Sequence, residues 1–236
     1  MRQLVVGAGE VGSAIAAVLT GAYEVSIRDM VGETPRADVL HVCFPWSDDF
    51  ERAVRLYQTA SGTDLIIIHS TVPVGTSRRV GAIHSPVTGR HPDLVPSLRT
   101  FTKWFGGGQA AQAAAVFAAC GVSTETVPDP ETTEAGKLWQ TLQYGWLIAL
   151  QKEAYRYCFL EGADPEVAYG RMNETYNAGY AALGEPFRLP VLADMPGPIG
   201  GHCVIPNAVM TASRLGEMLL ELDAGWALDA AQEDVA

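Results

Sequence analysis

The sequence predicts an α/β protein, with a doubly wound parallel sheet followed by a long helix and a small all-α region. Short apolar runs alternate with helical stretches up to residue 127, as expected for strands covered on both faces. Glycines cluster where the first apolar run ends, and the later sequence is helical. We therefore expect two domains, at 1–127 and 128–236.

The expected strands are short and mostly apolar. They are "LVV" (4–6), "YEVSIRD" (23–29), "DVLHVCFP" (38–45) and "DLIIIHSTVP" (64–73). The segments "KWFGGG", "AQAAAVFAACG" and "STETVP" supply further strand and helix material as far as residue 127. Strands that alternate with helices in this way are typical of a parallel sheet.

The second domain is expected to be helical. One long helix should run from about Asp129 to Glu161, and its apolar surface around 138–160 exceeds what a small domain can cover, which predicts a homodimer through this region. A second helix should begin at Asp164 as N-cap. After a Pro/Gly-rich loop (184–203), a last helix is expected from Asn207 to Asp223 with a frayed tail.

Composition limits the classes of partner. The formal net charge of -11 argues against nucleic acid or an anionic membrane as the main partner, whereas a small anionic molecule can still bind a local basic pocket. The N-terminus runs directly into a strand–turn–helix signal, so no signal peptide is expected. The four cysteines form no CxxC pair. We therefore expect reduced thiols, no metal site and a cytoplasmic protein.

The first turn carries a dinucleotide-binding pattern. Gly7, Gly9 and Gly12 form G-x-G-x-x-G between a strand and a helix, which suits a tight turn, close approach to a pyrophosphate and helix–strand packing. Asp29 ends the second strand, where a carboxylate binds ribose hydroxyls and favours NAD over NADP, although the adjacent Arg28 would suit a 2′-phosphate. The sequence therefore predicts a Rossmann-type NAD-binding domain.

Further cofactor contacts are expected at the carboxyl ends of the strands. In "HSTVPVGTSRR" (69–79), Gly75 and Thr76 open a helix that is either a second anion-binding N-terminus or a plain strand-to-helix connection. The expected cofactor-binding residues are Gly7, Gly9, Glu10, Val11, Gly12, Asp29, Phe44, Pro45, Ser70 and Thr71.

Four segments, taken in order, resemble the UDP-glucose/GDP-mannose dehydrogenase family. They are "GAGEVG", "STVPVGTSR", "TEAGKLWQTLQYGWLIALQKEA" and "GPIGGHCVIP", and the resemblance covers almost the whole chain. The last is similar to the "GGHC" form of dehydrogenases that act on N-acetylated UDP-hexosamines, while the second is also shared with β-hydroxyacid dehydrogenases. The resemblance implies a Rossmann NAD domain, a helical dimerisation region and a cysteine loop facing the nicotinamide.

The resemblance also implies catalytic roles in an NAD-dependent oxidation of an alcohol through an aldehyde that a cysteine captures. Cys203 matches the nucleophile, Lys137 the lysine that stabilises the oxyanion, and Thr71 the threonine that orients a water. Thr141 stands at the family asparagine, on the same helix face as Lys137. His202 is a candidate base, and His202 with Cys203 is not expected to bind a metal.

Three departures accompany the resemblance. Val87 stands at the glutamate of the family's "SPE" motif and Asn207 at an aspartate, and neither side chain can act as a base. The family's third, nucleotide-binding domain has no counterpart in 236 residues, which implies a smaller substrate, a separate subunit that supplies the domain, or a degenerate enzyme. We expect an NAD-dependent oxidoreductase that oxidises a hydroxyl or aldehyde of a sugar nucleotide or related small anionic metabolite. The alternative is a catalytically silent NAD-binding homologue acting as a partner or regulatory subunit.

Overall fold

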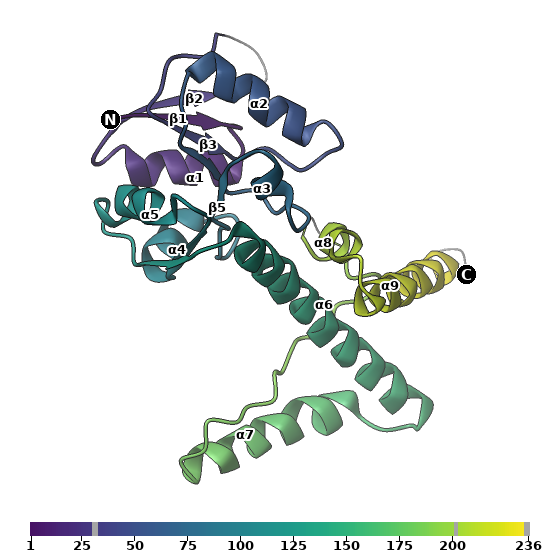
Figure 1. Ribbon diagram of the computed structural model, residues 1–236. Helices are drawn as coiled ribbons and strands as arrows, with labels where there is room; N and C mark the ends of the chain where they lie inside the picture. The colour runs from purple at the N-terminus through teal and green to yellow at the C-terminus, as the bar shows by residue number, and fades with distance from the viewer. Residues whose placement is uncertain (30–32, 201–202, 234–236) are drawn as a thin grey trace. The chain divides into compact units, whose positions relative to one another are not determined.

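The computed structural model describes residues 1–29, 33–200 and 203–233 (Figure 1). The chain divides into two compact units, Met1–Leu138 and Trp139–Ala236. The first unit therefore includes the first two turns of the long helix, beyond the expected boundary at residue 127.

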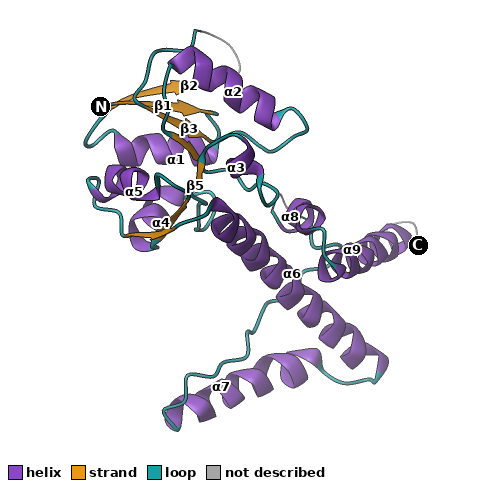
Figure 2. Cartoon of the chain, in the orientation of Figure 1, coloured by secondary structure: helices purple, strands orange, loops and turns teal. Residues whose placement is uncertain are grey.

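The first unit is built on one sheet, whose strands are the arrows of Figure 2. Within the described residues its order is β2-β1-β3-β4-β5-β6-β7. The strands are β1 (Arg2–Val6), β2 (Glu24–Arg28), β3 (Val39–Val42), β4 (Ile66–Ile68), β5 (Ile83–His84), β6 (Lys103–Gly106) and β7 (Thr124–Val127). In this described sheet the neighbouring strands are parallel apart from β5 and β6, which pair antiparallel at His84 and Gly106. The Rossmann-type doubly wound sheet is confirmed, with this one antiparallel pair.

Helices cover both faces of the sheet (Figure 1). On one face Val5 and Ile67 pack with α1 (Glu10–Leu19), α4 (Leu94–Thr100) and α5 (Ala110–Ala118). On the other face Leu4 and Ile66 pack with α2 (Phe50–Ser61), and the loop after α3 (Thr76–Arg79) joins this core through Val80. Successive strand residues point to opposite faces, so each strand must be apolar on both sides, which explains the continuous apolar runs in the sequence.

The long helix of the sequence analysis is confirmed as α6 (Pro130–Leu160). Its first turn is capped by Asp129, whose Oδ1 accepts a hydrogen bond from the Thr132 backbone N–H at 2.9 Å. The second helix begins as expected at Asp164, whose Oδ1 accepts from the Glu166 N–H at 3.0 Å. It differs from the expectation in starting with a π-helix, η1 (Glu166–Arg171), before α7 (Met172–Ala182).

The expected single helix from Asn207 to Asp223 is wrong. The structure has two helices there, α8 (Val204–Thr211) and α9 (Arg214–Glu233). They are separated at Ala212, which adopts a left-handed conformation with φ 45° and therefore cannot continue a right-handed helix. The residues expected to fray are helical as far as Glu233.

The second unit has a small apolar core. Leu142 and Ala149 of α6 pack with Val204 and Ala208 of α8 and Leu219 of α9. The absence of a side chain at position 145 permits this packing, since a Cβ on Gly145 would lie 2.5 Å from Val204 Cγ1 and 2.6 Å from a Leu219 methyl. By contrast, η1 and α7 contain no buried residue.

Candidate functional site

The glycine turn has the geometry that its pattern predicts. Gly7 has φ 101°, and a Cβ there would lie 2.8 Å from the backbone carbon of Cys43. A Cβ on Gly12 would lie 1.8 Å from the Gly7 carbonyl oxygen, so only glycine lets α1 pack this close to the turn. A Cβ on Gly9 would meet nothing within 4 Å. The two outer glycines are thus required by the fold, while the middle one borders open space.

This open space lies at the point where the order of the sheet reverses. In the sheet β1 lies between β2 and β3, so the chain passes from β2 on one side of β1 to β3 on the other side. Ligands of open α/β sheets bind at such a point, outside the carboxyl ends of the strands. The helix α1 begins at Glu10 with Gly9 as its N-cap, which offers no side chain to the first backbone N–H groups. Those groups and the helix dipole favour an anion beside Gly9. Phe44 and Pro45 follow β3 at the same edge.

Asp29 directly follows β2, and its side chain is exposed. The preceding Arg28 lies with its guanidinium 5.3 Å from the centre of the Tyr57 ring of α2. Phe44 packs against Tyr57 and Phe50, with ring centres 6.0 and 4.9 Å apart. The carboxylate at the end of β2 is therefore available to a ligand, while the adjacent arginine is engaged with an aromatic ring.

Ser70 connects the carboxyl ends of three strands. Its hydroxyl donates to the carbonyl oxygen of Phe44, after β3, at 2.6 Å. Its own carbonyl oxygen lies 3.3 Å from Nε2 of His84, which ends β5. Thr71 follows Ser70 and is half-buried. Ser70 thus joins the segment after β3 through its hydroxyl and the end of β5 through its carbonyl oxygen.

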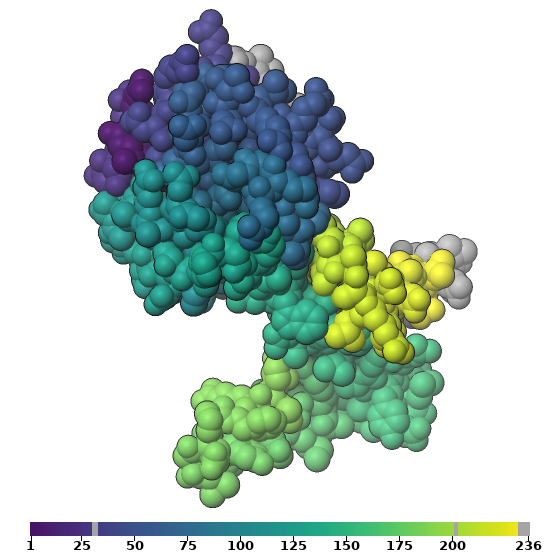
Figure 3. Space-filling view, in the orientation of Figure 1, coloured from purple at the N-terminus to yellow at the C-terminus, as the bar shows by residue number. Residues whose placement is uncertain are grey.

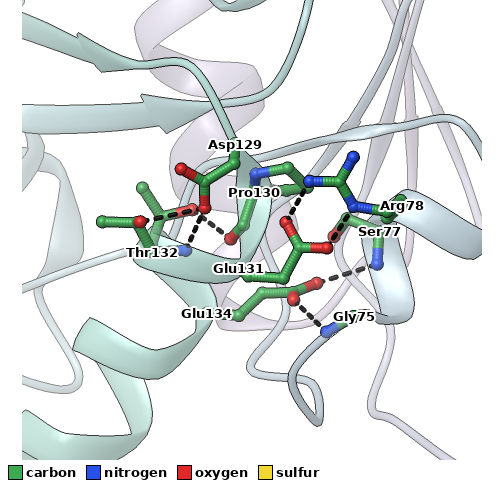
Figure 4. A network of polar contacts seen from close by, with 9 residues as sticks. Gly75, Ser77, Arg78, Asp129, Pro130, Glu131, Thr132 and Glu134 are labelled. Carbon is green, nitrogen blue, oxygen red and sulfur yellow. Dashed lines mark hydrogen bonds and ion pairs between the residues drawn. The ribbon is translucent and has the colours of Figure 1, made fainter.

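The second candidate anion site is wrong, because the chain fills it with its own carboxylate (Figure 4). Glu134 of α6 is fully buried and accepts hydrogen bonds from the backbone N–H of Gly75 at 2.5 Å and of Ser77 at 2.8 Å. Burial raises the pKa of the Glu134 carboxyl, and these two N–H donors oppose that rise. Figure 4 also shows Arg78 paired with Glu131. The segment is therefore the strand-to-helix connection that the sequence left open.

Lys137 lies on α6 within the first unit and is half-buried. Its ammonium group donates to the carbonyl oxygen of Val87 at 2.9 Å. The Val87 side chain is buried, so the position of the family glutamate is occupied by apolar packing. One turn earlier, Thr133 Oγ1 lies 2.9 Å from Nδ1 of His84. The first two turns of α6 thus contact the segments that follow β4 and β5.

The remaining predicted catalytic residues belong to the second unit. Cys203 is exposed and stands at the N-cap of α8, and its carbonyl oxygen accepts from the N–H of the buried Asn207 at 3.1 Å. Thr141 is half-buried, four residues after Lys137 on α6. His202 lies outside the described residues. The predicted catalytic set is therefore divided between the two units.

The segment before Cys203 is held by side chains of α6 and α9. Lys152 is buried and donates to the carbonyl oxygens of Met195 and, at 2.7 Å, Gly197. Gln151 donates to Asp194 at 2.9 Å, and Asp223 accepts from the Ile199 N–H at 2.6 Å. Residues 194–199 are thus held in place by these side chains, although they form neither helix nor strand.

Sequence reasoning missed a buried set of titratable side chains. His41, His69 and Lys103 lie within the first unit, almost or entirely without exposure to solvent. Burial lowers the pKa of His41 to about 3 and that of Lys103 to about 7. The signal was present, because His41 and His69 interrupt the apolar runs "VLHV" and "IIIH" at positions that a sheet buries.

Comparison with known proteins gives matches in structure alone. No protein-family model matches the chain, and no curated protein matches it in sequence. The solved UDP-D-ManNAc dehydrogenase of Pyrococcus horikoshii has a TM-score of 0.78 at 19% identity, and the match covers 98% of this chain and 70% of that one. A 3-hydroxyisobutyrate dehydrogenase of Mycobacterium tuberculosis has a TM-score of 0.69 at 17% identity, over 97% of this chain and 94% of that one. The native UDP-N-acetyl-mannosamine dehydrogenase of Staphylococcus aureus has a TM-score of 0.69 at 17% identity, over 99% and 70%.

These likenesses show that the chain has the fold of these dehydrogenases through both of its units. Among the described residues, no helix is both long and apolar enough to cross a membrane. Within the same residues, no group of three or more His, Cys, Asp or Glu side chains is placed to hold a metal ion.

Proposed function

We propose that the protein is an NAD-dependent dehydrogenase that oxidises the CH–OH group of a small anionic metabolite, of the sugar-nucleotide or a related class. The observation that carries this proposal is the open space at Gly9, at the reversal point of the sheet, with Asp29 at the end of the adjacent strand. The fold shared with dehydrogenases of sugar nucleotides and of a hydroxy acid supports it.

The residues present fit NAD. The first N–H groups of α1 would donate to a pyrophosphate beside Gly9, where an added Cβ would meet no protein atom within 4 Å, and Gly7 and Gly12 permit the close turn and packing at this point. Asp29 would accept hydrogen bonds from the ribose hydroxyls, and its charge would disfavour a 2′-phosphate. When bound, NAD supplies the hydride acceptor.

Lys137 is the residue that we assign to the developing negative charge on the substrate oxygen. Its ammonium group lies beside Val87 O, and an ammonium group supplies both positive charge and N–H donors, which suit a substrate oxygen on which negative charge develops. Thr71, which follows the fixed Ser70, orients a water molecule or the substrate hydroxyl. Thr141 adds a hydroxyl on the same face of α6 as Lys137.

Cys203 is proposed to capture an aldehyde as a thiohemiacetal. Its sulfur forms a bond to the carbonyl carbon, and the thiol proton goes to the former carbonyl oxygen. The buried Val87 and the amide of Asn207 cannot serve as the bases that hydrolysis of a thioester needs. The residues present thus favour a two-electron oxidation over the four-electron route, with His202 as the remaining candidate base.

A homodimer through the helical region is part of the proposal. The light-green atoms of Figure 3 belong to α7 and the segment after it. No residue of α7 is buried. Large apolar side chains are exposed on and beside these helices, among them Phe159 at 83%, Leu183 at 77% and Leu160 at 71%. Apolar surface of this kind marks an interface, and a second copy supplies the same surface.

The free cysteines agree with a cytoplasmic site for the protein.

A pair of glycine variants tests the cofactor site. Gly9→Ala adds a methyl group to open space, so it should leave the melting temperature unchanged and weaken NAD binding at least tenfold in isothermal titration calorimetry. Gly12→Ala places the same methyl 1.8 Å from a backbone oxygen and should destabilise the fold itself. Equal NAD affinity of Gly9→Ala and the wild type would contradict the proposed site.

Activity is tested by NADH formation on a panel of sugar nucleotides and hydroxy acids. Lys137→Met should abolish turnover while NAD binding persists, and Cys203→Ala separates alcohol oxidation, which it should retain, from aldehyde oxidation. Tight NAD binding without turnover on any compound would favour the silent homologue that Val87 and Asn207 also suit.

A further inference from the structure

A line of polar side chains crosses the sheet beneath α5. It consists of Gln3 (β1), His41 (β3), His69 (after β4), Ser85 (after β5) and Lys103 (β6), here called the buried polar row. Each lies two residues from an apolar residue of the core that α1, α4 and α5 cover, and so on the same face of the sheet, and all five are at most 3% exposed. None of these residues has a part in the proposed chemistry.

Hydrogen bonds run along the row in one direction. His69 Nδ1 lies 2.9 Å from the carbonyl oxygen of Ser85, which can only accept, so this nitrogen carries the proton. His69 Nε2 then accepts from His41 Nδ1 at 3.0 Å, and His41 Nε2 requires a donor. Gln3 supplies it when its amide is turned end for end, which also gives a partner to the buried Gln3 Nε2. Both histidines are thus neutral, and Lys103 is the remaining titratable residue of the row.

Lys103 is buried against aromatic rings and donates only to backbone carbonyls in the contacts that the structure gives it. Its Nζ lies 3.0 Å from Ser85 O and 3.1 Å from Pro86 O, and 5.6 and 5.3 Å from the ring centres of Phe105 and Phe117. A protonated or a neutral amine has the two N–H groups that these carbonyls need. The titratable groups that interact electrostatically with Lys103 are His41, Cys43, His69, His84 and Lys137.

The segment 85–87 is the link between Lys103 and Lys137. Its three successive carbonyl oxygens accept hydrogen bonds from side chains: Ser85 O from His69 and Lys103, Pro86 O from Lys103, and Val87 O from Lys137. All these contacts lie within the first unit. Lys103 thus holds two carbonyls of the segment whose third carbonyl accepts from Lys137.

We propose that Lys103 is a positioning residue for Lys137, which it holds through the backbone of Ser85, Pro86 and Val87. The inference rests on the proposed function in one respect, since the catalytic role of Lys137 belongs to it. The link between the two lysines is independent of that role. In Lys103→Met the side chain keeps its length, Pro86 O loses the Lys103 donor and Ser85 O keeps that of His69, so the segment is held less firmly.

Nuclear magnetic resonance of lysine side chains tests the link directly, because the chain contains three lysines, Lys103, Lys137 and Lys152. With ¹³C at the lysine Cε, each residue gives one signal, assigned by single Lys→Met variants. In Lys103→Met the Lys137 signal should move, while that of Lys152, bound to carbonyls of the second unit, should stay. Lys152→Met is the matched control, which removes another buried lysine that donates to backbone carbonyls and should leave the Lys137 signal in place.

Turnover provides the second measurement. Lys103→Met should lower kcat about tenfold or more with the KM for NAD unchanged, since only the substrate-side lysine is misplaced. If Lys103→Met does not fold, the wild-type signals decide: the Lys137 signal should change with pH at the midpoint of the Lys103 titration. An unmoved Lys137 signal in folded Lys103→Met, or no shared midpoint in the wild type, would overturn the link. A wild type that shows the link but neither binds NAD nor turns over refutes the proposed function alone.

Discussion

Acidification is expected to destabilise the first unit because it contains buried histidines that stay neutral. Burial lowers the pKa of His41 and of His84 to about 3, and that of His69 well below its ordinary value. In the unfolded chain a histidine has a pKa of about 6.5. Between these two values the unfolded state binds protons that the folded state cannot, so stability is present above pH 6.5 and is lost as the pH falls.

The size of the loss follows from the two values. Between pH 7.5 and pH 5, one histidine with a pKa of about 3 in the folded state loses about 2 kcal/mol of stability relative to the unfolded chain. His41 and His84 together lose about 4 kcal/mol, and His69 adds to this in the same direction. A typical domain is stable by about 5–15 kcal/mol, so the effect is large.

Urea unfolding at pH 7.5, 6 and 5 measures this loss as the change in the free energy of unfolding. His84→Gln should reduce the loss by about 2 kcal/mol, since glutamine does not titrate. His91, whose side chain is 51% exposed beside Glu10, offers a control: His91→Gln should leave the large acid dependence in place. A loss below about 1 kcal/mol in the wild type, or an equal effect of both variants, would refute the reasoning.

Three further predictions concern other elements. Between about pH 7 and 10.5 the free energy of unfolding should rise by up to about 1.4 kcal/mol per pH unit. The reason is that Lys103 loses its proton at about pH 7 in the folded protein, whereas the unfolded chain keeps it. Urea unfolding of Lys103→Met should lack this rise. Glu134→Gln should lower the free energy of unfolding by about 1–3 kcal/mol, since an amide leaves Gly75 or Ser77 facing an N–H group, and an unchanged value would show that the cap is dispensable. Gly145→Val should separate α8 and α9 from α6 and lower the melting temperature, whereas an unchanged melting temperature would contradict the packing of the second unit.

Local patterns were sufficient for much of the fold and for the cofactor turn. The apolar runs predicted the strands because each strand is covered on both faces, and the Asp129 cap and uninterrupted helical pattern predicted α6. Gly7 and Gly12 are glycines for reasons of space that act within one turn and its neighbouring strand. Such features depend on residues near one another in sequence or on a recurrent motif.

Features that depend on distant partners were decided only by the tertiary structure. The sequence at the N-terminus of α3 is compatible with an anion site, but in the structure its N–H groups donate to Glu134, which lies far along the chain. Whether His41 and His69 pair, and whether Lys103 reaches the carbonyls beside Lys137, depends on the order of strands in the sheet, which no local pattern contains. The break at Ala212 lies between two helices that pack with α6, and the residue type itself carries no signal for it. Local geometry depends on residues that are close in the sequence and can be predicted from them, whereas these contacts form only when the sheet brings distant strands together.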